Sequence, residues 1–108
     1  MKYLWSLAVL AAVAVSAHAA PAAGEALAKE KGCLGCHAVD HKVVGPAYED
    51  VAAKYAGQKD AAAKLTQKVL NGGGGVWGGP IAMPPQSANV TPEQAKQLVQ
   101  WVLSLKKK

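Results

Sequence analysis

The residues best suited to do chemistry are Cys33, Cys36 and His37, which stand together in the pentapeptide CLGCH. They are the two cysteines of the chain and the histidine that directly follows them. Two thiols at this spacing can close a disulfide, help to bind a metal, carry out dithiol redox chemistry or anchor a c-type haem. The remainder of the sequence has to distinguish these four uses.

Three of the four uses agree poorly with the rest of the chain. A structural zinc site needs four ligands, and adding His41 would place all of them within residues 33–41, a segment too short to surround the metal. Thioredoxin-like chemistry requires the two cysteines near a βαβ pattern, and the sequence shows no strand of note. A structural disulfide is compatible with an exported protein, but it leaves His37 unexplained.

Haem attachment accounts for the order of the residues. Positions three apart are neighbours on one side of a helical turn, so Cys33 and Cys36 can bond two vinyl groups of the same porphyrin. His37 follows immediately and can carry its imidazole under the centre of the ring, where it would be an axial ligand of the iron. We therefore expect one covalent haem c in each chain.

The sixth iron ligand decides the function, because an open site binds gases or activates peroxide, whereas methionine favours electron transfer. Apart from Met1, the sole methionine is Met83, in a Gly- and Pro-rich segment and followed by Pro84 and Pro85. Prolines hold the preceding residue extended, so we expect a stiff strap that presents Met83 to the iron. The alternatives are that Met83 fills space in the core, or that His41 is the ligand, although His41 would lie on the side of His37.

The N-terminus has the pattern of a secretory signal peptide. Lys2 precedes an apolar run over residues 3–15, and Ala17-His18-Ala19 fits an A-x-A cleavage sequence. We expect residues 1–19 to be removed after Ala19, which leaves residues 20–108 as one soluble periplasmic domain without stable membrane insertion. The alternative is a membrane anchor, but the run is shorter than the roughly 20 residues that a spanning helix needs.

The composition of the domain predicts a thin core. The chain has no phenylalanine, and much of its apolar content is alanine, which buries little area. Domains of this size usually need stabilisation beyond their apolar core, such as a disulfide or a bound metal. A disulfide across two intervening residues would constrain the unfolded chain little. A covalently bound haem would supply the missing apolar centre.

The net charge of +5 comes from dispersed lysines, with one short run at residues 106–108. This pattern predicts no nucleic-acid surface. It favours weak steering of acidic protein partners, and we expect a monomer.

Four helices are expected, in an all-α fold with one long structured Gly/Pro-rich loop. The apolar spacing places them at residues 21–35, 48–56, 61–70 and 92–105. Asp60 is expected to cap the third helix, and Thr91 to open the fourth as a capping box with Gln94.

Four motifs in order make the chain, from about residue 25 to 106, resemble the small bacterial class I cytochromes c of the c-551/c-552 type. They are CLGCH at 33–37, VVGPAY at 43–48, GVWG at 75–78 and MPP at 83–85. The resemblance implies a four-helix fold around one covalent haem with His/Met ligation. It also implies a non-enzymatic electron shuttle between membrane cytochromes and a terminal reductase or oxidase, for example nitrite reductase. A haem peroxidase or gas-binding sensor is the alternative.

The resemblance also assigns supporting roles. It implies that the Pro46 carbonyl accepts the ring N–H of His37, and that Trp77 donates its indole N–H to a haem propionate, with simple packing as the alternative. Lys68 matches a basic position near a propionate, and Gln86 an amide position beside the methionine sulfur. Two features depart from the pattern: the loop at 78–83 is one residue longer, with Ala82 where proline is usual, and Lys68 lacks the planar fork of arginine.

Overall fold

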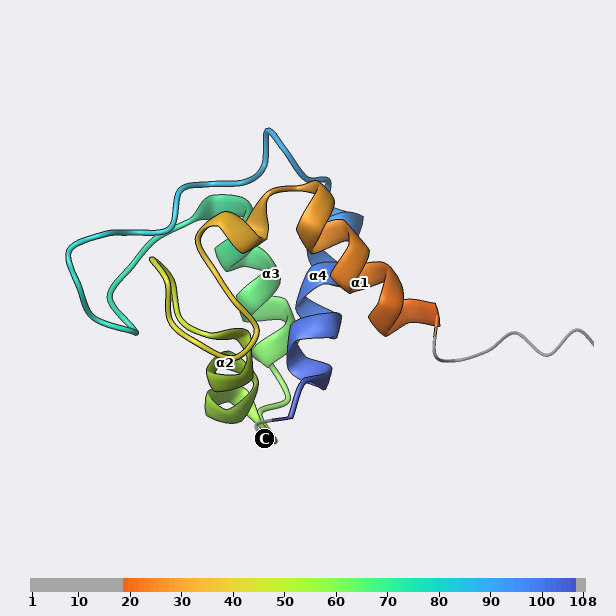
Figure 1. Ribbon diagram of the computed structural model, residues 1–108, viewed down its shortest axis with the longest axis horizontal. Coiled ribbons are helices and arrows are strands. Elements are labelled where there is room, and N and C mark those ends of the chain that lie inside the picture. Colours follow the sequence, from red (N-terminus) through yellow and green to blue (C-terminus); the bar gives the residue numbers. More distant parts are fainter. Residues whose placement is uncertain (1–18, 107–108) are drawn as a thin grey trace, which may run out of the picture.

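The computed structural model describes residues 19–106, and the predicted signal peptide lies outside the described residues except for Ala19. The described chain contains α1 (Ala19–Glu30), the short 3-10 turn η1 (Cys33–Gly35), α2 (Tyr48–Tyr55), α3 (Ala61–Asn71) and α4 (Pro92–Ser104) (Figure 1). Over these residues the β structure is limited to one isolated bridge between Gly73 and Met83. The all-α prediction is therefore confirmed. No helix in this part of the chain is long and apolar enough to cross a membrane.

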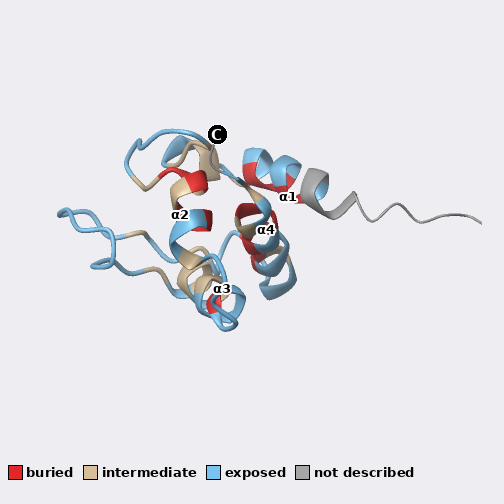
Figure 2. Cartoon of the chain, turned by 90° about the horizontal axis from the view of Figure 1, so that it is seen from below, coloured by how far each residue is buried: buried red, intermediate tan, exposed pale blue. Residues whose placement is uncertain are grey.

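Helix α4 is the centre of the fold, because it packs against α1, α2 and α3. Its buried face follows the helical spacing expected from the sequence, with Leu98, Val99 and Val102 turned inward (Figure 2). Trp101 is buried beside them, at 5% exposure. The sequence analysis had not placed Trp101 on this face. Apart from Trp101, the buried residues around α4 have small and medium side chains, and no large side chain in the described region is below 2% exposure.

Gly24 allows α1 and α4 to approach each other closely. A Cβ atom at this position would overlap the Cβ of Trp101 and lie 3.0 Å from the carbonyl oxygen of Gln97. Because backbone and a buried ring surround the position, neither neighbour can move aside easily. Gly24 therefore permits the crossing that sets α1 against the central helix.

The start of α4 is the predicted capping box. The Thr91 hydroxyl accepts from the Gln94 backbone N–H at 3.1 Å, and the Gln94 side chain accepts from the Thr91 N–H at 3.0 Å. We expect Thr91→Ala to lower the free energy of unfolding by about 1 kcal/mol, since it leaves a helix N–H without its partner. Denaturant unfolding of the loaded protein measures this change.

Thr66→Ala is the matched control for the cap. The Thr66 hydroxyl bonds the Ala62 carbonyl within α3, at an exposed position that caps nothing. Its removal should change the free energy of unfolding by less than the removal of Thr91 does. An equal loss in both variants would show that the capping box contributes nothing specific.

Two local expectations were wrong. The first helix ends at Glu30 and not at residue 35, because Gly32 adopts φ 77° and breaks it, so the cysteine motif starts in the separate turn η1. Asp60 precedes α3 but makes no capping hydrogen bond with its side chain. Its carboxylate instead pairs with Lys64 at 3.2 Å, one turn further along the helix.

The two long loops extend to the same side of the helices. The segment between η1 and α2 and the segment between α3 and α4 both lie on the left in Figure 1. These two segments carry the Gly45-Pro46 pair, the GVWG motif and the MPP motif.

Candidate functional site

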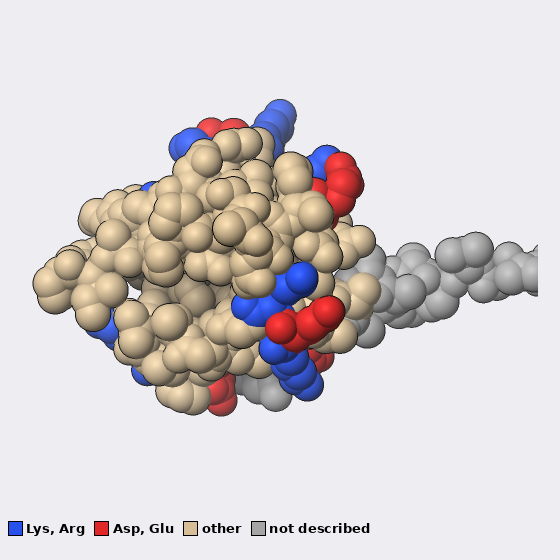
Figure 3. All heavy atoms as spheres, turned by 90° about the horizontal axis from the view of Figure 1, so that it is seen from above, with Lys and Arg blue, Asp and Glu red and all other residues tan. Residues whose placement is uncertain are grey.

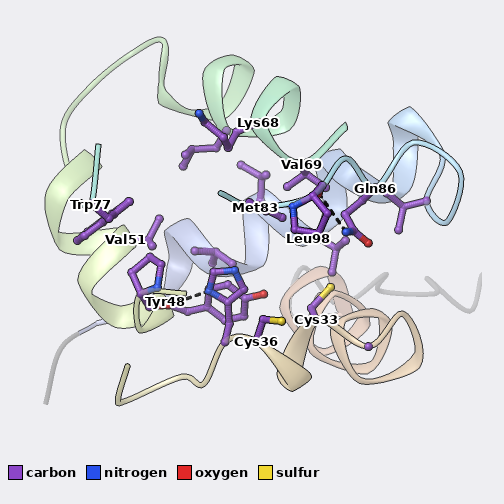
Figure 4. A pocket seen from close by; sticks show the side chains of 18 residues that line it. Cys33, Cys36, Tyr48, Val51, Lys68, Val69, Trp77, Met83, Gln86 and Leu98 are labelled. Carbon is purple, nitrogen blue, oxygen red and sulfur yellow. Dashed lines mark hydrogen bonds between the residues drawn. The ribbon is translucent and has the colours of Figure 1, made fainter. Parts of the chain in front are cut away.

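A pocket between the helices and the two long loops brings together every site residue predicted from the sequence (Figure 4). Helices α2, α3 and α4 supply its apolar walls. Cys33 and Cys36 lie along one wall, and Met83 lies across from them. The predicted residues that line it are Cys33, Cys36, His37, Pro46, Lys68, Trp77, Met83 and Gln86, and the apolar ones include Val51, Leu65, Val69, Val90, Leu98, Val99 and Val102.

The imidazole of His37 is oriented by a backbone hydrogen bond. Its Nδ1 lies 2.8 Å from the carbonyl oxygen of Pro46. Because a carbonyl only accepts, Nδ1 carries the proton, and Nε2 keeps its lone pair for a metal. The contact implied by the family resemblance is therefore present in the structure.

The turn at residues 36–45 brings the Gly45 backbone against the same imidazole. The amides of Val44 and Gly45 both donate to the Cys36 carbonyl, at 3.1 and 2.7 Å. A Cβ at Gly45 would overlap Cε1 of the His37 ring. Only glycine leaves room for the histidine at this position, which explains the glycine that precedes Pro46.

Tyr48 is a site residue that the sequence analysis missed. It lines the pocket, and its ring is stacked on that of His37, with centroids 4.7 Å apart and an interplanar angle of 18°. Burial, with a smaller contribution from Cys33, raises the pKa of Tyr48 well above its usual range, and burial also raises the pKa of the Cys33 thiol. The available signal was the position of Tyr48, two residues after Pro46.

The raised pKa of Tyr48 predicts a loss of stability at alkaline pH. A free tyrosine ionises near pH 10, so above that pH the unfolded chain loses this proton before the native protein does. The contribution of Tyr48 to the free energy of unfolding is therefore fully present below about pH 10. It is lost as the pH rises toward the native pKa, by up to about 1.4 kcal/mol per pH unit. We expect urea unfolding of Tyr48→Phe to show a shallower alkaline decline. Equal slopes in the two proteins would contradict this expectation.

The segment that carries Met83 is fastened to the end of α3. Gly73 and Met83 exchange two backbone hydrogen bonds, of 2.9 and 3.1 Å, and the Gln86 amide donates to the Val69 carbonyl at 2.9 Å. Gly72 adopts φ 72°, and a Cβ there would overlap the Met83 carbonyl oxygen. These contacts make the strap a defined structure and hold Met83 at the pocket.

The Gln86 side chain spans the turn within this strap. Its Nε2 donates to the Pro84 carbonyl at 3.1 Å, and its Oε1 lies 3.5 Å from the side-chain nitrogen of Asn89. Asn89 in turn donates to the Lys31 carbonyl at 2.9 Å, which connects the strap to the residues after α1. The expected role of Gln86 beside the methionine sulfur stays a prediction.

Lys68 on α3 and Trp77 on the long loop lie at the same pocket (Figure 4). Trp77 is 43% exposed, and the ammonium of Lys54 lies 5.4 Å from the centroid of its ring, a cation–π contact between α2 and the loop. The Lys68 ammonium lies over Gly73. Their proposed contacts with propionates stay predictions.

The donor set and the lining of this pocket fit a haem. An imidazole with a free Nε2 and a thioether stand on different walls, and that pair of axial ligands is characteristic of cytochromes c. Two thiols lie beside the imidazole, and the space between is bounded by aliphatic side chains. Among residues 19–106, no cluster of three or more His, Cys, Asp and Glu side chains suited to a metal ion is found.

Comparison with known proteins gives a consistent result. The family model for cytochrome c matches residues 21–106. Cytochrome c-552 of Hydrogenobacter thermophilus is 60% identical over 84 residues, which cover 78% of this chain and 83% of that protein. Cytochrome c-552 of Nitrosomonas europaea is 47% identical over 106 residues, or 98% of this chain and 100% of the relative.

The fold agrees with a solved structure as well. The crystal structure of wild-type Nitrosomonas europaea cytochrome c552 superposes with a TM-score of 0.71 at 51% identity, covering 76% of this chain and 99% of that one. The matched relatives are cytochromes c, which are electron carriers and not enzymes. The four-helix class I fold, the covalent haem c and the electron-carrier function follow from these findings, and the chain belongs to the cytochrome c family.

Proposed function

We propose that this cytochrome c carries single electrons in the periplasm, between a membrane cytochrome and a terminal reductase or oxidase such as nitrite reductase, with His37 and Met83 as the axial ligands. The observation that carries the proposal is the placement of His37 and Met83 at one apolar pocket, each fixed by backbone hydrogen bonds. With both residues holding the iron, no open position would remain for peroxide or a gas, which disfavours that chemistry.

Each residue of the site has a defined task in this proposal. The bound haem supplies a one-electron couple between Fe(II) and Fe(III). Cys33 and Cys36 anchor it through thioethers and take no part in redox chemistry. Pro46 fixes the proton of His37 on Nδ1, and the strap holds Met83. Because both ligands are held by the backbone, they keep their places in both oxidation states.

The rim of the pocket is proposed to receive the redox partner. Val43 and Val44 are 45% and 50% exposed and follow the Cys36 turn, and Val76 and Ile81 are 54% and 67% exposed in the Gly-rich loop. On the face of the molecule shown in Figure 3, a hollow is bordered mainly by uncharged residues, with a group of charged side chains near one edge. A small apolar rim bordered by lysines, with Lys68 in the pocket lining and Lys54 against Trp77, suits the weak, transient contacts of redox proteins.

Export is proposed from the N-terminal segment. The family match begins at residue 21, two residues after the predicted cleavage at Ala19. The crystallised Nitrosomonas cytochrome is almost wholly covered by 76% of this chain, whereas the full sequence of the cytochrome c-552 of that organism matches 98%. This difference in length is what removal of a leader would produce.

Spectra of the purified protein test the central proposal. We expect a low-spin ferric spectrum, a sharp α band after reduction with dithionite, and no rapid binding of CO or cyanide. The intact mass from a periplasmic extract should equal residues 20–108 plus one haem. A high-spin ferric spectrum with rapid CO binding would support the peroxidase or gas-sensor alternative and overturn the proposal.

A further inference from the structure

We propose that Tyr48 is a positioning residue for His37: its ring sets the plane in which the imidazole approaches the iron. This inference rests on the proposed role of His37 as an axial ligand. The ring of Tyr48 stacks on the imidazole at 4.7 Å between centroids and 18° between planes. No family motif quoted above assigns a task to this side chain.

The hydrogen bond to Pro46 cannot set the ring plane alone. One contact from Nδ1 to a carbonyl, at 2.8 Å, directs one edge of the ring. The terminal side-chain torsion of histidine is broad, so the opposite edge can still swing. A flat group packed against the face of the imidazole opposes this swing, and Tyr48 is that group.

The backbone of Gly45 also confines the His37 ring, and it can lie this close because glycine has no side chain. Its backbone lies so close that a Cβ would overlap Cε1 and come within 2.7 Å of Nδ1. The imidazole is thus confined by the Gly45 backbone, the Pro46 carbonyl and the Tyr48 ring. Of these three groups, Tyr48 alone acts through a side chain, so mutation can remove it without altering the turn.

Tyr48 is itself held in place by two independent contacts. Its backbone N–H donates to the Ala38 carbonyl at 2.9 Å, which ties the start of α2 to the residue after His37. Its ring meets Trp101 edge to face, with centroids 5.4 Å apart and planes at 78°. Contacts with the buried core therefore fix the Tyr48 ring, which in turn packs against His37.

The orientation of the axial imidazole governs how unpaired spin is distributed over the pyrrole rings of a ferric haem. The four haem methyl resonances in the ¹H NMR spectrum of the ferric protein report this distribution. A single fixed plane gives well-separated methyl shifts, whereas averaging over several orientations narrows their spread. This readout follows ligand orientation and is insensitive to a modest loss of stability.

The experiment compares Tyr48→Leu and Tyr48→Phe in the haem-loaded protein. Leucine removes the flat face, and phenylalanine keeps it while removing the hydroxyl. Tyr48→Met keeps apolar volume without a ring, in case the leucine variant does not fold. Tyr55→Leu is the matched control, because Tyr55 also lies on α2 and packs on the core but does not line the haem pocket.

We expect Tyr48→Leu and Tyr48→Met to shift the haem methyl resonances and narrow their spread, while Tyr48→Phe and Tyr55→Leu keep the wild-type pattern. Wild-type shifts in the leucine or methionine variant would overturn the inference. So would a change in Tyr48→Phe equal to that in Tyr48→Leu, which would assign the effect to the hydroxyl, or an equal change in Tyr55→Leu, which would make it a general packing effect. Failure of the proposed function would appear separately, as a wild-type spectrum without low-spin His/Met character.

Discussion

Replacement of Met83 by alanine will abolish the weak far-red charge-transfer band between sulfur and iron in the ferric protein. No other methionine is present beyond the predicted signal peptide, so no second thioether from a methionine can take its place. The strap brings Met83 to the pocket through its paired hydrogen bonds with Gly73, and the truncation removes the sulfur while these backbone bonds remain. We expect the open sixth site to bind CO in the ferrous state and the reduction potential to fall, since methionine ligation raises it.

Ile81→Ala is the matched control for this variant. Ile81 lies in the same loop, two residues before Met83, and is 67% exposed. Its truncation should leave the far-red band and the potential close to wild type. A band that persists in Met83→Ala would contradict the assignment. The rival ligand His41 would then be tested by His41→Ala; its Nδ1 in the structure faces Asp40 at 2.8 Å, on the exposed surface.

The second large effect concerns folding. We expect the double variant Cys33→Ala/Cys36→Ala, expressed without attached haem, to lose most of its helical circular dichroism. The physical reason is the hollow centre of the fold. Side chains of α2, α3 and α4, such as Val51, Val69 and Leu98, line the pocket, and the haem would supply the apolar surface against which they pack there. A small domain with few large buried side chains cannot offset its chain entropy without that contact area.

The single variants Cys33→Ala and Cys36→Ala serve as controls for the double variant. Each keeps one thioether, so each should retain the haem and a helical spectrum. Far-UV circular dichroism and thermal unfolding of all three proteins make the comparison. Native-like helicity in the haem-free double variant would show that the polypeptide core suffices.

Much of the fold was predictable because its signals are local. The capping box of α4 depends on Thr91 and Gln94, three residues apart, and was found as expected. The apolar face of α4 followed from helical spacing. The end of α1 was misplaced because the apolar pattern continues past Gly32, whose left-handed backbone, φ 77°, ends the helix in the structure. Asp60 does occupy the N-cap position of α3, but its carboxylate pairs with Lys64, one turn away, and makes no capping hydrogen bond.

The functional site likewise has features that the sequence predicts and features that only the structure shows. The sequence by itself determined the haem attachment, because Cys33, Cys36 and His37 are adjacent and their order carries the chemistry. It also pointed to Met83, since the domain contains no other methionine. Only the tertiary structure decided what surrounds the imidazole. The stacking of Tyr48 on His37 joins α2 to the segment after η1, and the edge-to-face contact of Trp101 with Tyr48 joins α4 to α2. No spacing along the chain reports which of these rings will meet when the elements pack.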